Sequence, residues 1–232
     1  MQIATKHLIS IWIKGTQLPL LRLGLLAISM AVVAQAATFN IADGDVAGLI
    51  AAINTANANP DADTINLASG GTYTLTQVGG LDGWNGPSGL PIINGQLTIN
   101  GNGATIQRSS AAGTPDFRII FWTSGDLSLD GVTIKGGKGG DGAGLLIKGS
   151  TNPYIGKVLI RNSTITENNT QYSGAVSYGG YLGGAGGGIQ NMGSLTLMNS
   201  TISRNRSFSG YGGGGISNFA PGRTTIVNST IF

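Results

Sequence analysis

The sequence predicts an all-β fold, a right-handed parallel β-helix (a solenoid) with a short helix capping its N-terminal end. Three observations lead to this prediction. An eight-residue unit recurs along the second half of the chain, glycine accounts for 40 of the 232 residues, and charged residues make up only 10%. Recurrence of one unit at a period of 29 to 37 residues is typical of stacked supersecondary units.

The first 36 residues have the pattern of a secretory signal peptide. Basic residues come first: Lys6, Lys14 and Arg22. A 12-residue apolar run, Leu23 to Ala34, follows and is too short to span a bilayer. Ala34 and Ala36 then offer small residues for cleavage before Ala37. We expect an exported chain, in the periplasm, on the outer membrane surface or outside the cell, without a membrane span in its mature part; whether residues 1–36 are removed stays open.

The charge of the chain depends on that segment. Three of the 13 Lys and Arg residues lie before Ala37, so 10 cations and 10 carboxylates remain after it and their net charge is 0. No basic patch remains to indicate a nucleic-acid partner. The only histidine, His7, lies in the same segment, and the chain has no cysteine. Disulfides, thiolate chemistry and histidine acid–base chemistry are therefore excluded from the mature part.

Residues 37–96 are expected to form an N-terminal cap and the first strands. Asp45 is a good N-cap, and apolar residues follow it at helical spacing, which predicts a helix over 45–57. Pro60 cannot continue that helix. Alternating residues then predict strands over 64–67 and 72–75, and residues 79–89, with Trp84, are expected to be a loop.

Residues 97–232 are expected to form the repeats. The unit occurs at Leu127–Ile134, Val158–Ile165, Leu195–Ile202 and Thr224–Ile231, and Leu97–Ile106 is the same unit with two more residues. A second motif, Gly-Gly-Ile-x-Asn, stands at 187–191 and 214–218. A constant unit at unequal spacing indicates a fixed strand with variable loops between copies.

Stacking of these units predicts two structural columns. Alternation along the strand places one set of apolar side chains in the interior: Leu129, Ile160, Leu197 and Ile226. A second inward column is expected from Asn162, Asn199 and Asn228, because stacked amides can hydrogen-bond to one another and Asn tolerates a left-handed bend. The same residues begin Asn-Ser-Thr triplets, which match glycosylation acceptor sites. Because the triplets occupy the same position in each repeat, the inward column is the better explanation.

Two other folds fit less well. A leucine-rich horseshoe needs a helical segment in each repeat, where this chain has Gly and Asn, and an immunoglobulin-like sandwich does not repeat side chains column by column. The chain ends at Phe232, directly after a repeat strand and without a cap. This leaves open that the sequence is the N-terminal part of a larger, autotransporter-like passenger.

The residues at 49–67 and the repeats carry a family resemblance. Leu49-Ile-Ala-Ala-Ile-Asn-Thr-Ala-Asn57 with Asn59–Leu67 resembles the N-terminal cap of exported bacterial right-handed β-helix proteins, and the Gly-Gly-Gly-Ile and Asn-Ser-Thr-Ile units resemble repeats of the pectate-lyase-like superfamily. The Asn of Ile165–Asn168 and Ile202–Asn205 is similar to that of the Phe-x-x-Asn element in polymorphic outer membrane proteins. The resemblance implies the fold, and it leaves the activity open because this superfamily hosts many functions.

The sequence contains few candidate residues for catalysis. The Asn-Thr-Asp, Asp-Asp and His-Gly elements of β-helix polygalacturonases are absent. A polysaccharide lyase needs a cation to neutralise a uronate and a Lys or Arg as base, and three candidates lie on or beside the repeat strands: Lys157, Arg161 and Arg204. Arg161 aligns with Asp130 in the outward column, which favours surface ion pairs.

No cofactor is expected, with one calcium site left open. Residues 136–144 partly match the Gly-Gly-x-Gly-x-Asp calcium repeat, with Asp141 as the ligand, but the motif occurs once. Hard oxygens also occur in the pairs Asp43/Asp45 and Asp61/Asp63, although Asp45 is better explained as a helix cap and Asp61 as a turn residue after Pro60.

The glycine-rich insertions contain the most suggestive side chains for binding: Tyr172, Tyr178, Tyr181, Phe208 and Tyr211. Exposed aromatic residues in loops suit stacking on sugars or contact with proteins, and packing onto the barrel side is the structural alternative. We therefore expect a non-catalytic, secreted or cell-surface protein that binds a polysaccharide or a host or cell-surface protein through these loops. A polysaccharide-active enzyme, foremost a lyase, is the second candidate.

Overall fold

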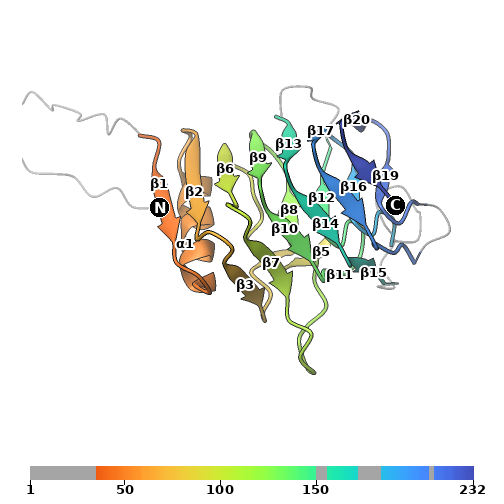
Figure 1. Ribbon diagram of the computed structural model, residues 1–232, viewed down its shortest axis with the longest axis horizontal. Helices are drawn as coiled ribbons and strands as arrows, with labels where there is room; N and C mark the ends of the chain where they lie inside the picture. The colour runs from red at the N-terminus through yellow and green to blue at the C-terminus, as the bar shows by residue number, and fades with distance from the viewer. Residues whose placement is uncertain (1–34, 150–155, 172–183, 209–211) are drawn as a thin grey trace, which may run out of the picture. The chain divides into compact units, whose positions relative to one another are not determined.

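A computed structural model describes residues 35–149, 156–171, 184–208 and 212–232. The chain divides into two units, Met1–Val33 and Ala34–Phe232, and all described residues belong to the second. This unit is mostly β, with stacked parallel sheets and one helix (Figure 1), so the predicted all-β parallel architecture is confirmed at that level. No helix in the described ranges is long and apolar enough to cross a membrane.

Three parallel sheets contain most of the strands. The seven-stranded sheet has the order β1 (Thr38–Ile41), β2 (Asp63–Leu67), β6 (Leu97–Asn100), β9 (Leu127–Asp130), β13 (Val158–Arg161), β17 (Ser194–Met198) and β20 (Arg223–Val227). The six-stranded sheet has the order β3 (Thr72–Leu75), β7 (Thr105–Arg108), β10 (Thr133–Lys135), β14 (Thr164–Thr166), β18 (Thr201–Ser203) and β21 (Thr230–Ile231). The four-stranded sheet has the order β8 (Ile120–Trp122), β12 (Leu145–Ile147), β16 (Ile189–Asn191) and β19 (Ile216–Asn218).

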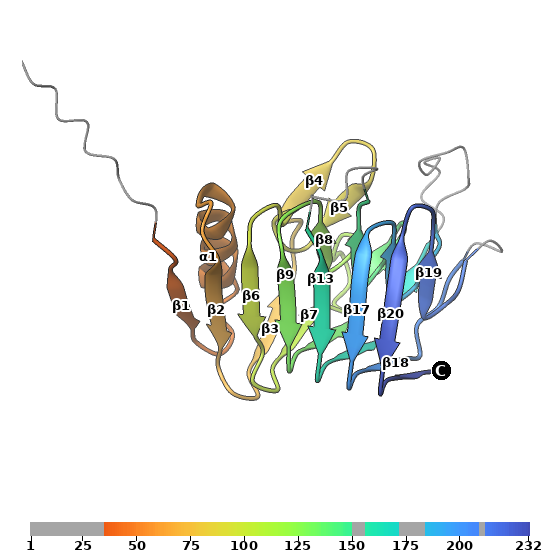
Figure 2. The ribbon, with the colours of Figure 1, turned by 90° about the horizontal axis from the view of Figure 1, so that it is seen from above.

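The chain visits these sheets in a repeating order. From β6 onward, a strand of the seven-stranded sheet is followed by one of the six-stranded sheet and then by one of the four-stranded sheet. Each repeat unit of the sequence therefore forms two strands with a bend between them, as β9 and β10 do. Figure 2 shows the seven strands side by side in this order. A small parallel pair, β11 (Lys138–Gly139) and β15 (Asn169–Thr170), lies outside the three sheets.

The helix α1 (Val46–Ala58) confirms the helix expected over 45–57. The Asp45 carboxylate caps it by accepting a hydrogen bond from the Gly48 backbone N–H at 2.8 Å. The buried face of α1 joins the core that also contains residues of β1, β2 and β3, and α1 contacts these three strands. It therefore covers apolar surface of the first strands, as a capping helix should.

The apolar column occupies successive strands of the seven-stranded sheet. The register pairs Leu129 with Ile160, Ile160 with Leu197, and Leu197 with Ile226. The first three are fully buried, whereas Ile226 is 47% exposed. The difference follows from position, because β20 is the edge strand of the sheet and only β17 pairs with it.

The prediction that the asparagine side chains form an inward column is wrong. Asn162, Asn199 and Asn228 do adopt left-handed backbone, with φ of +50°, +48° and +47°, and so form the bends. Their side chains are exposed, however. A left-handed residue at a bend directs its side chain outward, and the following residue takes the inward position.

The inward ladder at these bends is made of serine. Ser163 and Ser200 are buried, and the Ser163 backbone N–H donates to the Ser200 hydroxyl at 3.2 Å. The Ser200 N–H donates in the same way to the Ser229 hydroxyl at 3.1 Å. Each hydroxyl in turn donates to the carbonyl two residues earlier in its own strand. The Asn-Ser-Thr triplet therefore satisfies buried backbone groups through its middle residue.

The segment expected to be a loop at 79–89 contains a short antiparallel hairpin instead. Its strands are β4 (Gly80–Asp82) and β5 (Gly86–Ser88). The Asp82 carboxylate accepts hydrogen bonds from the backbone N–H groups of Trp84 and Asn85, both at 2.9 Å. These bonds form the turn, as Asp side chains commonly do, and they leave Trp84 exposed at its tip.

Leu197→Asp tests the inward assignment. Burial of an unpaired carboxylate costs several kcal/mol, so we expect this variant not to fold. Thr196→Asp is the matched control, because Thr196 is the outward neighbour on β17 and is expected to keep the melting temperature within a few degrees. Circular dichroism and thermal melts give the result, and a Leu197→Asp protein that melts like the parent would contradict the assignment.

Candidate functional site

The predicted aromatic site falls largely outside the described residues. This applies to Tyr172, Tyr178, Tyr181 and Tyr211. Phe208 is described: it is 64% exposed, and its backbone N–H donates to the Thr170 hydroxyl at 2.9 Å. The aromatic loops stay a prediction.

Asp141, the calcium candidate, is engaged by the backbone. Its Oδ1 accepts hydrogen bonds from the N–H groups of Gly184 and Ala185, at 2.7 and 2.8 Å. No group of three or more His, Cys, Asp or Glu side chains that could hold a metal occurs among the described residues. These bonds join two turns of the chain, and a calcium ion at Asp141 stays a prediction.

Arg118 lies beside Asp141 and is 1% exposed. Its guanidinium donates to the carbonyls of Asp141, Gly86 and Asn85. The group also lies over the Phe121 ring, 5.4 Å from its centre. Burial lowers the pKa of Arg118 to about 10, which the charges of Asp141 and Asp82 oppose. The side chain is therefore charged at neutral pH and fastens the β4–β5 hairpin to the body of the protein.

Asp82 holds the other side of this hairpin. Burial by itself would raise the pKa of its carboxyl, but hydrogen bonds from Asn85 and Trp84 and the charge of Lys148 outweigh burial, so the pKa is lowered. Lys148 Nζ lies 3.9 Å from Asp82 Oδ2. The ionised carboxylate is therefore part of the folded hairpin.

The three cations considered for lyase chemistry all have a carboxylate partner. Arg161 pairs with Asp130 at 3.0 Å, as the column alignment predicts. Arg204 lies 3.6 Å from Glu167, and Lys157 lies 4.0 Å from Asp126. Lys157 and Arg161 lie at opposite ends of β13 and Arg204 directly follows β18, so the structure does not gather them into one site.

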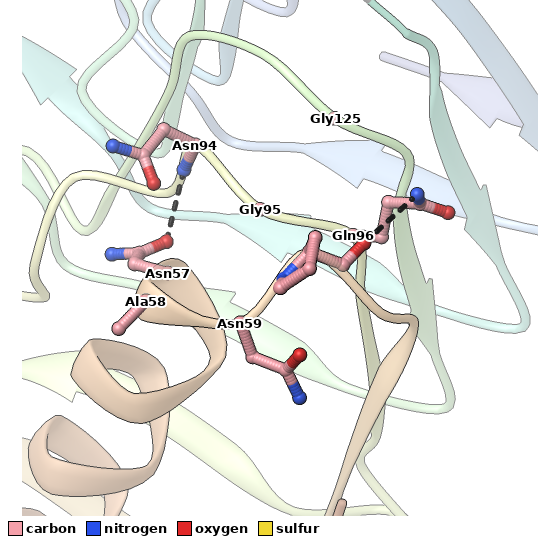
Figure 3. A pocket seen from close by; sticks show the side chains of 8 residues that line it. Asn57, Ala58, Asn59, Asn94, Gly95, Gln96 and Gly125 are labelled. Carbon is pink, nitrogen blue, oxygen red and sulfur yellow. Dashed lines mark hydrogen bonds between the residues drawn. The ribbon is translucent and has the colours of Figure 1, made fainter. Parts of the chain in front are cut away.

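A hollow among the described residues lies at the end of α1 (Figure 3). We call it the amide pocket; it has a volume of about 410 Å³ and is lined by Asn57, Ala58, Asn59, Pro60, Asn94, Gly95, Gln96 and Gly125. Three of its four amide side chains make hydrogen bonds within the fold. Asn57 accepts from the Asn94 N–H at 3.0 Å, Gln96 donates to the Pro60 carbonyl, and Asn59 donates to Asp63. The amide side chains that line this pocket therefore mainly join the end of α1 to neighbouring loops.

Another hollow lies over the carboxyl ends of strands in the six-stranded sheet. We call it the polar groove; it has a volume of about 440 Å³ and is lined by Thr74, Gln107, Arg108, Ser109, Ser110, Lys135, Gly136 and Glu167. These residues come from β3, β7 and β10 and from the residue after β14, which are successive neighbours in the sheet. At about 4.8 Å per strand, the lining extends roughly 14 Å across the strands.

Two of the residues that line the polar groove are cations, and each is paired with a carboxylate. Lys135 Nζ lies 3.2 Å from Glu167 Oε2, and both side chains are partly exposed. Arg108 is held by Asp116 at 3.2 Å and by the carbonyls of Thr114 and Pro115. The lining therefore has two cations and one carboxylate, and its remaining side chains carry hydroxyl and amide groups.

Sequence reasoning missed these residues, although a signal for two of them existed. Gln107 and Lys135 occupy the position after the conserved Thr-Ile of the repeat, where the register pairs them across β7 and β10. The repeat alignment could therefore have placed these two long polar side chains side by side, whereas Thr166 and Ser203, at the same position of the next two repeats, are buried. The approach of Arg108 and Glu167 to them depends on the bends after the strands.

Comparison with known proteins gives no identification, since no family model, curated protein or solved structure matches the chain.

The pH dependence of stability tests the Asp82 contacts. Because the pKa of Asp82 is lowered in the folded protein, the ionised group stabilises the fold above the ordinary carboxyl pKa, and this contribution disappears as the pH falls through the lowered value. We expect urea unfolding to show that the parent loses more unfolding free energy than Asp82→Asn between about pH 7 and about pH 3. Equal losses in the two proteins would contradict a stabilising role for the carboxylate.

Proposed function

We propose that this protein is an exported, right-handed parallel β-helix that binds an acidic glycan, without catalysis, along the polar groove. The observation that carries the proposal is the lining of that groove. Its side chains end in hydroxyl, amide, ammonium, guanidinium and carboxylate groups, with no large apolar residue among them. Such a surface offers many hydrogen bonds to a hydroxylated ligand and little apolar area to bury.

The direction of the groove supports a linear polymer as the ligand. Its lining residues lie on four successive neighbours in the sheet, so the groove crosses the strands along the stacking direction. An extended chain of sugars lying along this direction would meet equivalent positions of consecutive strands. The repeating scaffold would thereby match a repeating ligand.

The charge supports an acidic glycan over a neutral one. Lys135 is the cation with the most freedom to turn toward a ligand, because its only hydrogen-bonding partner in the described part of the chain is Glu167 and the pair is partly exposed. Exposed pairs of this kind are weak, and a uronate carboxylate could replace Glu167 at little cost. Arg108, held by the Asp116 carboxylate and by three backbone carbonyls, is a fixed cation beside it.

A polysaccharide lyase is the second candidate, favoured by the same two cations. A lyase needs positive charge to neutralise the uronate and a basic side chain to remove a proton, and Lys135 beside Arg108 offers both kinds of group. The ammonium group of Lys135 is already paired with the Glu167 carboxylate at 3.2 Å, an arrangement that suits binding of an acidic ligand better than removal of a proton.

Lys135→Ala tests the groove. Loss of one charge-assisted hydrogen bond should weaken binding to polygalacturonate or alginate by about tenfold, close to 1.4 kcal/mol, and lower the salt dependence of binding. Lys157→Ala is the matched control, because it removes the same charge from an exposed ion pair beside β13, in the other large sheet. Isothermal titration against both polymers gives the result, and equal affinities for parent and Lys135→Ala would remove the groove as the binding site.

Turnover separates the two candidate functions. A lyase leaves an unsaturated sugar that absorbs in the ultraviolet, and we expect no such product from pectate or alginate, with or without Ca²⁺. Binding with product formation would replace the non-catalytic proposal with the lyase.

The proposal also includes the tyrosines of the glycine-rich insertions as a second surface that contacts the ligand. Replacing Tyr172, Tyr178, Tyr181 and Tyr211 with Ser should weaken binding on a glycan or host-matrix array at nearly unchanged melting temperature if they contact the ligand. A large drop in melting temperature would instead assign them to packing, since loss of buried aromatic groups costs about 3–5 kcal/mol each.

A further inference from the structure

Asp63 is a buried carboxylate with an unusual environment. It is the first residue of β2 and is 1% exposed. Its Oδ1 accepts two hydrogen bonds, from the Ala37 backbone N–H at 2.6 Å and from Asn59 Nδ2 at 3.1 Å. Its Oδ2 is buried and has no hydrogen-bond partner among the described residues. No Lys or Arg of the described ranges forms an ion pair with it, whereas five other carboxylates of these ranges have such partners.

This environment lacks the positive charge that a buried carboxylate requires. An ionised group removed from water is costly unless it is paired and fully hydrogen-bonded. The neighbouring groups add to the cost. Asn59 is the C-cap of α1, so Asp63 lies beside the negative end of the helix dipole. Asp61, two residues earlier, is a second carboxylate whose Oδ2 is buried without a partner. None of the described Lys and Arg residues forms an ion pair with either carboxylate.

The sequence indicates a group that can supply a positive charge beside Asp63. Ala34 and Ala36 are small residues after an apolar run, which places signal-peptide cleavage directly before Ala37. The atom that donates to Asp63 in the intact chain is the backbone nitrogen of Ala37 itself. We propose that the chain is cut between Ala36 and Ala37 and that the new α-ammonium group of Ala37 forms a partly buried ion pair with Asp63.

The cut converts a neutral donor into a charged one. Water adds across the Ala36–Ala37 peptide bond: its oxygen completes the carboxylate of Ala36, and the nitrogen of Ala37 takes up protons and becomes an ammonium group. The amide has one N–H, whereas the ammonium has three and a positive charge. It therefore supplies further donors for a carboxylate that has one unpartnered oxygen, and charge-assisted hydrogen bonds are about twice as strong as neutral ones.

Two features of the fold fit this processing. Gln35 and Ala36 are exposed, so the bond lies within reach of a peptidase. The Ala37 carbonyl accepts a hydrogen bond from the Thr64 N–H at 2.8 Å, and β1 begins at the next residue. The new terminus is therefore already held against β2, and the ion pair would fasten β1, the edge strand of the seven-stranded sheet, against fraying.

Export of the full chain from a bacterial host tests the cut. We expect mass spectrometry of the purified protein to give a chain that begins at Ala37. A chain beginning at any other residue overturns the inference. This result does not depend on the groove, because a protein cut before Ala37 that binds no glycan leaves the inference intact.

Titration of the α-amino group tests the ion pair. A carboxylate in contact raises the pKa of an amine, so NMR of the reductively ¹³C-methylated terminus should give a pKa about one pH unit or more above the usual α-amino value of about 8. Asp63→Asn should return the pKa to that value, whereas Asp116→Asn, which removes a carboxylate paired on another sheet, should leave it raised. If Asp63→Asn does not fold, the α-amino pKa of the parent protein is sufficient as a test. An ordinary value in the cut parent protein overturns the ion pair.

Discussion

The parallel register between neighbouring strands is the constraint on which the rest of this structure depends. A strand of four residues with two apolar side chains cannot bury them alone, and it gains a core only when the next strand brings like residues into alignment about 4.8 Å away. The pairing of Leu129 with Ile160 and of Ile160 with Leu197 shows this alignment. A shift of one residue in any strand would turn its apolar side chains to the solvent. The repeat in the sequence is the consequence, because each strand must match its two neighbours.

The bends between strands follow from the same constraint. A chain that turns from one sheet to the next must leave no buried backbone group unpaired, and it must do so at the same place in each turn. Left-handed Asn or Gly residues make the turn, and Ser163 and Ser200 bind the backbone groups exposed by it. A buried amide ladder serves another bend, where Asn168 donates to Asn205 at 3.0 Å and Asn205 donates to the Ile165 carbonyl. Gly188 lies against this ladder, since a Cβ there would be 2.9 Å from Asn205 Nδ2.

Because the interior is filled by these columns, binding chemistry is left to the outer faces and to the ends of the sheets. The outward positions of the repeat are free to vary, and the chain uses them for ion pairs such as Arg161 with Asp130 and for the groove around Lys135. The division between a filled interior and free outer surfaces also explains where the two buried charged residues of the described chain lie. Arg118 is surrounded by carbonyls and lies over an aromatic ring, whereas Asp63 lies at the first strands, where a processed terminus can reach it.

The sequence alone determined the periodic part of this protein. Alternation within the Leu195–Ile202 unit predicted which side chains face inward, and Asp45 and Pro60 predicted the limits of the helix, because these signals depend on neighbouring residues. The orientation of Asn162 was decided by the tertiary structure, since a left-handed bend exchanges the inward and outward positions of adjacent residues. The tertiary structure also determined which residues meet in the polar groove. Glu167 lies 32 residues after Lys135 in the chain and contacts it only because β10 and β14 are paired in register. Contacts of this kind arise from the stacking of turns, and the sequence of a single turn does not contain them.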